Sequence, residues 1–172
     1  MAEYRFSTLW YLEAPVESVW DAIYHSRRWP NWWRGVEQVL DLEAGDDNGL
    51  GALQRYTWKS VLPYRLTFDM RVTRIEPLVC LEGRASGEVD GCGGWYFSRE
   101  GTLTVVRYDW QVRTTKRWMN LLAPLAQLLF KWNHNAVMRA GGRDLARLLD
   151  ARLVAVAHRR PARPQRPRVG GN

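Results

Sequence analysis

Three histidines are the side chains best suited to proton transfer near neutral pH, and one of them has a suggestive setting. His134 lies between Asn133 and Asn135, in a polar interruption of an apolar stretch. From there an imidazole could reach a pocket and act as a general acid or base near its unperturbed pKa. The alternative is a histidine that faces solvent or bonds to a backbone carbonyl. No Ser-His-Asp or Cys-His set can be singled out, so no catalytic residue is assigned and enzymatic activity stays open.

Metal and phosphate chemistry have less support in the sequence. Cys80, Cys92 and the histidines are scattered, without the close Cys-x-x-Cys or His-x-x-x-His pairs that hold a metal ion. Glycines cluster at residues 49–51 and 91–94, but neither cluster precedes a helix or carries the Gly-Lys-Ser/Thr ending of a phosphate-binding loop. We interpret these glycines as turn residues. The sequence therefore predicts no metal site and no cofactor.

Alternation of apolar and polar residues predicts a series of strands. The clearest pattern covers residues 64–76, where every second side chain from Tyr64 to Val72 is apolar, as expected for an antiparallel sheet with one buried face. Residues 86–94 indicate a turn or bulge region, and Pro15 begins a helix that a second short helix follows. The other predicted strands cover residues 4–12, 36–42, 53–58, 79–85, 95–99 and 103–114.

The longest predicted element is a helix over residues 118–154, in which apolar residues recur at helical spacing. A helix of this length with an apolar face needs a large partner surface, which a curved sheet would supply. Gly141 and Gly142 interrupt the helix, at a cost in helix propensity of about 1 kcal/mol each. The pair predicts either a kink that lets a cavity open or close packing of the helix on the sheet.

The 172 residues, 46% hydrophobic and 25% charged, suit a single globular domain, which we place at residues 1–154. Residues 155–172 are predicted to form a disordered basic tail. Five arginines and no acid follow His158, and removing their charge from the net +7 leaves +2 on the domain. The domain itself is therefore not expected to bind nucleic acid, and nucleic acid is an unlikely partner of the chain. The tail either only solubilises the chain, makes peripheral contact with an anionic membrane or touches nucleic acid.

The expected location of the chain is the cytoplasm. The two cysteines form no disulfide framework and suit a reducing compartment. The first residues lack the apolar region of a secretory signal, and the longest apolar segment is too short and too polar to span a membrane.

The order of elements and several residues resemble the START/Bet v-like helix-grip superfamily (SRPBCC). This superfamily includes START lipid-transfer domains, plant pathogenesis-related ligand-binding proteins and bacterial polyketide cyclase/dehydrase-like proteins. The likeness covers about residues 4–153 and is carried by Ala14-Pro15, Val19-Trp20, Trp29-Pro30, Trp32-Trp33, Val36, Gly142, Leu145 and Leu148. It implies an α+β fold in which a curved antiparallel sheet of about six to seven strands wraps around a long C-terminal helix, with two short helices after the first strand.

The same resemblance implies a cavity between the sheet and the C-terminal helix, although aromatic residues at strand and helix spacing by themselves usually form a filled core. Ten Trp and seven Tyr suit either arrangement. Strand alternation and fold analogy together predict these ligand-lining residues: Trp33, Tyr56, Phe68, Met70, Leu81, Trp95, Trp110, Leu125, Leu129 and Trp132.

Three functions follow as hypotheses from the resemblance. The first is binding, with or without transport, of a hydrophobic small molecule such as a lipid or polyketide. The second is a polyketide cyclase/dehydrase-type enzyme that acts on an aromatic or polyketide precursor. The third is an interaction protein that binds ubiquinone or assists a membrane complex. Fold analogy alone does not choose among them.

Overall fold

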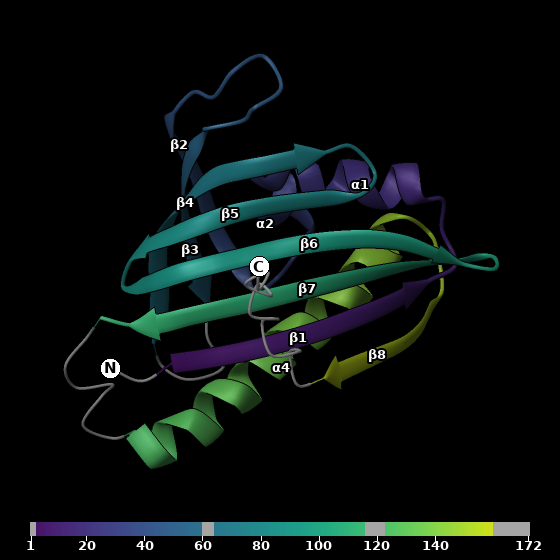
Figure 1. Cartoon of the computed structure of the whole chain (residues 1–172). Coiled ribbons are helices and arrows are strands. Elements are labelled where there is room, and N and C mark those ends of the chain that lie inside the picture. The colour runs from purple at the N-terminus through teal and green to yellow at the C-terminus, as the bar shows by residue number, and fades with distance from the viewer. Residues whose placement is uncertain (1–2, 60–63, 116–122, 160–172) are drawn as a thin grey trace, which may run out of the picture.

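The computed structural model describes residues 3–59, 64–115 and 123–159. Within these residues, eight strands form one antiparallel sheet in the order β2-β3-β4-β5-β6-β7-β1-β8 (Figure 1). The strands are Glu3–Leu12 (β1), Val36–Glu43 (β2), Leu53–Lys59 (β3), Arg65–Glu76 (β4), Cys80–Gly87 (β5), Val89–Glu100 (β6), Leu103–Thr114 (β7) and Leu153–Arg159 (β8). The helices are Val16–Tyr24 (α1), the 3-10 helix Ser26–Arg28 (η1), Trp29–Trp32 (α2) and Ala123–Leu148 (α4).

Figure 1 shows α1, α2 and α4 on one face of the sheet, with α4 crossing behind β1 and β7. This arrangement confirms the predicted α+β helix-grip fold, including the short helices that follow the first strand. The sheet has one strand more than the six to seven expected, because β8 pairs with β1.

The alternation in the sequence determines which side chains face the helices. In β1 the even-numbered residues are the inner set, and Trp10 and Leu12 are almost completely buried. In β4, Phe68 occupies the same inner face and is 5% exposed. Side chains of neighbouring strands therefore meet on one concave face, as a period of two requires.

The end of the chain differs from the prediction. Helix α4 ends at Leu148, and Asp150 adopts a left-handed φ of 48° where the chain reverses. Leu153–Arg159 then pair with β1, so the predicted domain boundary after residue 154 falls inside β8 and residues 155–159 belong to the folded domain. The sequence placed Leu153 in the helix because its spacing from Leu145 and Leu149 is helical. The edge of β1 would otherwise be unpaired, and it provides hydrogen bonds for a strand instead. Residues 118–122 of the predicted helix and residues 160–172 of the predicted tail lie outside the described residues.

The predicted turn at residues 86–94 is shorter than expected, because β6 begins at Val89 and includes the glycines at 91, 93 and 94. Gly93 lies directly opposite Trp110 of β7. A Cβ at Gly93 would lie 2.6 Å from the Trp110 ring, closer than side chains approach one another. Gly93 therefore makes room for an aromatic ring on the inner face, which is a recognised role of glycine within a strand.

The two glycines of α4 pack against two buried indoles. A Cβ at Gly141 would lie 2.3 Å from the ring of Trp33, which is fully buried. A Cβ at Gly142 would lie 3.1 Å from Trp10, which is 1% exposed. The geometry favours close packing over a kink as the reason for the pair, since any side chain at Gly141 would displace the helix or the indole.

Polar contacts also attach α4 to the rest of the domain. The Nε1 of Trp10 donates to the backbone carbonyl of Met138 at 3.0 Å. The carboxylate of Asp144, a residue only 2% exposed, accepts from the backbone N–H of Arg34 at 3.1 Å and from its Nε at 3.2 Å. Arg147 donates to the same carboxylate at 3.0 Å. The buried charge is thus paired and hydrogen-bonded, as its removal from water requires.

Candidate functional site

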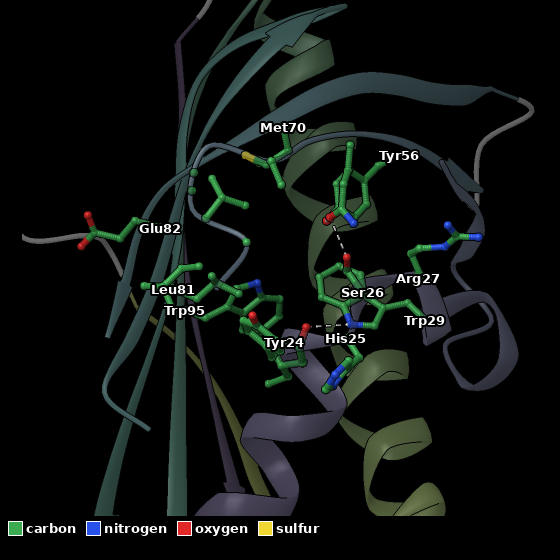
Figure 2. Close-up of a pocket in the computed structure, with 18 of the residues that line it drawn as sticks. Tyr24, His25, Ser26, Arg27, Trp29, Tyr56, Met70, Leu81, Glu82 and Trp95 are labelled. Carbon is green, nitrogen blue, oxygen red and sulfur yellow. Dashed lines mark hydrogen bonds between the residues drawn. The ribbon is translucent and has the colours of Figure 1, made fainter. Parts of the chain in front are cut away.

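A cavity of about 320 Å³ lies between the helical segment from Tyr24 to Trp29 and the inner face of strands β3 to β6. Figure 2 shows Tyr56, Met70, Leu81 and Trp95 around this hollow. We call it the larger cavity. None of the described residues of α4 lines it, so it lies beside the place predicted from the resemblance. Its size and largely aromatic and aliphatic wall are typical of small-molecule sites.

A hydrogen-bonded network forms the polar part of this wall. The hydroxyls of Ser26 and Tyr56 both donate to Oε1 of Gln54, each at 2.8 Å. The Nε2 of Gln54 donates in turn to Asp41 at 2.8 Å, and Arg27 pairs with the same carboxylate. Side chains from η1, β2 and β3 therefore hold one another in place, which makes this wall rigid before any ligand arrives.

Charge stays at the rim of the larger cavity. Hydrogen bonds from Gln54, and then from Arg27, lower the pKa of Asp41, so this carboxylate is ionised in the rim ion pair. Burial raises the pKa of Tyr56 to about 12, so its phenol remains a neutral hydrogen-bond donor. Glu82 points away from the hollow in Figure 2. The interior therefore suits an uncharged, largely apolar molecule.

A smaller cavity of about 110 Å³ lies between α4 and the inner face of the sheet. Phe130 and His134 of α4 contribute to its wall, together with Tyr4 of β1 and Trp110 of β7. This is the place at which the resemblance implied a cavity. The smaller cavity alone would hold little more than a fragment of a lipid or polyketide.

The two cavities share Trp58, Phe68 and Tyr108 in their walls. Tyr108 stacks on Trp95 with ring centroids 4.2 Å apart, and Phe68 packs on Trp110 at 5.2 Å. Burial, and then the nearby Tyr56, raise the pKa of the Tyr108 phenol. The two hollows are therefore neighbours with a common wall of three aromatic side chains.

Three buried polar atoms in the wall of the smaller cavity have no hydrogen-bond partner within the described structure. They are Oη of Tyr4, Nε1 of Trp58 and Nε2 of His134. Nearly all buried polar side-chain atoms of native proteins are satisfied by protein or water. The remaining wall is mostly apolar, so these atoms are its chemically distinctive part.

His134 reaches a pocket, as the sequence suggested, but not with the expected pKa. Its ring stacks on Phe6, with centroids 4.3 Å apart and planes 17° apart, and its Nε2 is buried. Burial, and then the neighbouring His158, lower the pKa of His134 to about 3. The imidazole is therefore neutral at physiological pH, neither solvent-facing nor close to its unperturbed pKa.

The structure brings together some of the ten residues predicted to line a ligand and separates others. The larger cavity contains five of them, and the smaller cavity contains Trp110 and shares Phe68. Trp33 is fully buried in the core and lines neither cavity, while Leu129 and Trp132 are 40% and 53% exposed on α4. The side chain of Leu125 lies outside the described part of the chain. The five residues of the larger cavity are Tyr56, Phe68, Met70, Leu81 and Trp95.

Several wall residues were absent from the sequence-based set. Tyr108 belongs to the same inward alternation as Trp110, so the pattern contained the signal that it faces the helices. Trp58 belongs to the same strand as Tyr56 and was detectable in the same way. Gln54 shares the alternation of Tyr56 and Trp58, but its polar side chain did not indicate a ligand contact. Ser26 had no such signal, because its role arises from the contact of η1 with β3.

Other chemistry has little support among the described residues. No group of three or more His, Cys, Asp or Glu side chains there is placed to hold a metal ion. Both cysteines are free thiols, with Cys80 buried and Cys92 exposed. No helix in the described ranges is long and apolar enough to cross a membrane.

The described elements thus form a helix-grip fold with an aromatic hollow beneath its helices. The chain belongs to the family described as polyketide cyclase/dehydrase and lipid transport, which matches residues 12–147. No curated protein sequence matches the chain.

Solved structures with the same fold come from bacteria and plants. The Zhui aromatase/cyclase from Streptomyces sp. R1128 superposes with a TM-score of 0.68 at 16% identity, covering 87% of this chain and 94% of that one. A START superfamily protein from Mycobacterium smegmatis has a TM-score of 0.69 at 12% identity, over 84% and 98% of the two chains. A ginseng major latex-like protein from Panax ginseng has a TM-score of 0.65 at 8% identity, over 86% and 97%. At these identities the likeness establishes the fold alone.

Proposed function

We propose that the protein binds one hydrophobic small molecule, such as a lipid or a polyketide, and releases it unchanged. The observation that carries this proposal is the larger cavity, whose volume of about 320 Å³ and aromatic wall suit such a molecule. The rigid network around Gln54 supports it, because a wall that is already ordered loses less entropy when a ligand binds. Family membership agrees with a hydrophobic ligand.

The proposed ligand contacts are the predicted residues that meet in the hollow. Tyr56, Met70 and Leu81 would contact the ligand in the larger cavity, with Trp95 as a flat aromatic surface. Phe68, in the wall between the cavities, would contact a ligand that enters both. Trp110 would contribute from the smaller cavity.

The second candidate function is a cyclase or dehydrase acting on an aromatic precursor in the same hollow. The family and the fold shared with an aromatase/cyclase support it. The pKa of His134, lowered to about 3, weighs against this imidazole as a general base at neutral pH, because an efficient base has a pKa near the working pH. At His134, the histidine of the smaller cavity, this favours binding over proton transfer.

Native mass spectrometry of the full chain, purified gently from its source, tests the proposal. We expect one small molecule per chain, lost on denaturation and recovered with its mass unchanged after incubation with the protein. Recovery of a new mass would instead support the cyclase or dehydrase.

A cavity-filling variant tests the location of the site. Leu81→Trp adds an indole to the wall of the larger cavity and should abolish retention of the molecule. Leu148→Trp is the matched control, because Leu148 is 50% exposed at the end of α4 and lines neither cavity. Full retention by a folded Leu81→Trp protein would rule out the larger cavity as the site.

A further inference from the structure

The smaller cavity contains polar atoms that the fold itself does not use. Oη of Tyr4 and Nε2 of His134 are both inaccessible to solvent and unpartnered within the described structure. Burying such groups without a hydrogen bond is costly, so they mark either a site for a bound molecule or a place for an ordered water. The two residues come from different elements, β1 and α4, and line the same hollow.

Aromatic contacts hold both side chains in position. The ring of Tyr4 packs edge-on against Phe130 of α4 with centroids 5.2 Å apart. The ring of His134 stacks on Phe6 at 4.3 Å. These contacts restrict the rotation of both polar groups before a ligand arrives, which is how a binding site gains orientation and specificity.

The chemistry of the lining selects for an uncharged group. Among the described residues that line the smaller cavity, none is an acid. The one formally charged residue of this wall is Lys59, which is exposed. A neutral imidazole nitrogen either donates or accepts, a phenol does both, and the indole of Trp58 only donates. Together they can satisfy a hydroxyl or carbonyl oxygen, whereas a carboxylate buried among them would have only the exposed, solvated Lys59 as a cation.

We propose that the smaller cavity is the polar recognition end of the ligand site, where Tyr4 and His134 hydrogen-bond an uncharged hydroxyl or carbonyl oxygen of an aromatic ligand. The apolar body of that ligand lies against Phe68 and Tyr108, the wall that both cavities share. This inference rests on the proposed binding function and adds the determinant that distinguishes oxygenated ligands from plain hydrocarbons.

Binding of 2-naphthol, naphthalene and 2-naphthoate to the full chain, followed by quenching of tryptophan fluorescence, tests the proposal. We expect 2-naphthol to bind about tenfold more tightly than naphthalene, since one neutral hydrogen bond to otherwise unsatisfied groups has that effect. The charged 2-naphthoate should bind more weakly than 2-naphthol. A wild-type protein that binds naphthalene and 2-naphthol equally, or binds none of the probes, would overturn the inference while leaving the binding function intact. The binding function is tested separately by native mass spectrometry, where a chain without any small molecule would count against it.

Two variants remove the polar atoms but keep rings. His134→Phe and Tyr4→Phe should each bring the ratio of naphthalene to 2-naphthol dissociation constants toward one, with naphthalene affinity changed less than about twofold. Tyr11→Phe is the matched control for Tyr4→Phe, because Tyr11 lies on the outward face of the same strand and lines neither cavity. An unchanged ratio in both cavity variants would overturn the assignment.

A measurement on the unmodified chain keeps the proposal testable if a variant fails to fold. The ¹⁵N resonances of the His134 ring report which nitrogen carries the proton and what it bonds. Saturation with 2-naphthol should shift the Nε2 resonance, while saturation with naphthalene should not. Identical spectra with both probes would show that a resident water or nothing at all satisfies Nε2, and would overturn the proposal.

Discussion

The imidazole of His134 on α4 lies nearly parallel to the ring of Phe6 on β1, with 4.3 Å between centroids and 17° between planes. Its pKa, lowered to about 3 by burial and then by His158, keeps the ring uncharged at neutral pH. A charged imidazolium in the same place would lose most of its hydration without gaining an anionic partner. The stack of His134 on Phe6 therefore favours the neutral form of the histidine.

We expect the free energy of unfolding to decrease as the pH falls from about 6.5 toward 3. In this window the unfolded chain binds a proton at His134 and the folded chain does not, so stability present above pH 6.5 is progressively lost. Urea unfolding at pH 7.5 and 5.0 should show a loss from this residue of about 1–2 kcal/mol. His134→Phe should reduce the pH dependence without abolishing it, because burial also lowers the pKa of His158. Identical pH dependence in both proteins would contradict the assignment.

Substitution of Gly141 by Ala should destabilise the domain despite the better helix propensity of Ala. The new methyl group would lie 2.3 Å from the indole of Trp33, which is fully buried and has no free space to enter. We expect a loss of about 2–3 kcal/mol in chemical denaturation, since overpacking of a core exceeds the roughly 1 kcal/mol gained by replacing a helical glycine. Gly142→Ala, with its closest contact at 3.1 Å, should cost less. Stabilisation by Gly141→Ala would show that the helix can move away easily.

Substitution of Asp144 by Asn should weaken the attachment of α4 to the segment that follows α2. The variant keeps the shape of the side chain but loses the charge that accepts hydrogen bonds from Arg34 and Arg147. We expect a loss of about 1.5–3 kcal/mol in the free energy of unfolding, the usual contribution of hydrogen bonds to a charged group. Asp150→Asn is the control, because Asp150 is exposed and Asn tolerates its left-handed φ. If both substitutions lowered the free energy of unfolding equally, Asp144 would have no special part in attaching α4.

The basic segment after β8 should determine any contact with anionic membranes. Truncation after Arg159 removes four arginines and no acid. With about 1 kcal/mol contributed per basic residue near such a surface, we expect at least tenfold weaker binding to phosphatidylserine vesicles. Thermal unfolding of the truncated chain should match that of the full chain, which separates membrane contact from stability. Unchanged vesicle binding would exclude this segment as the contact.

Much of the fold was predictable because its information is local. The alternation around Phe68 in β4 and Trp110 in β7 identifies inward side chains, since the period of a strand is two residues. The order of elements then restricts the architecture to a sheet around a helix. The glycine pair of α4 was recognisable as unusual within a helix, but its spacing did not distinguish a kink from close packing. The contact of Gly141 with Trp33 favours close packing.

The site was less predictable because it depends on which inward residues a neighbour covers. Trp33, which follows α2, and Trp95 of β6 are both buried aromatic residues. Gly141 lets α4 close over Trp33, whereas Trp95 remains in the wall of a hollow. No local pattern distinguishes these outcomes, because they depend on contacts between distant segments. Ser26 and Gln54 illustrate the same point for polar residues, since their hydrogen bond joins η1 to β3.

The sequence by itself therefore determined the strand alternation and the order of elements as far as α4, because both follow from the spacing of neighbouring residues. The predicted apolar stripe of the helix was wrong at Leu128, Leu129 and Trp132, whose side chains are exposed. Tertiary structure alone decided that residues 155–159 form a strand, since the edge of β1 had to be available to pair with them. It also decided that His134 lies neutral against Phe6 and that two cavities meet at Tyr108. Burial and cavity shape arise from the way separate elements pack, and that information is not contained in any short stretch of the chain.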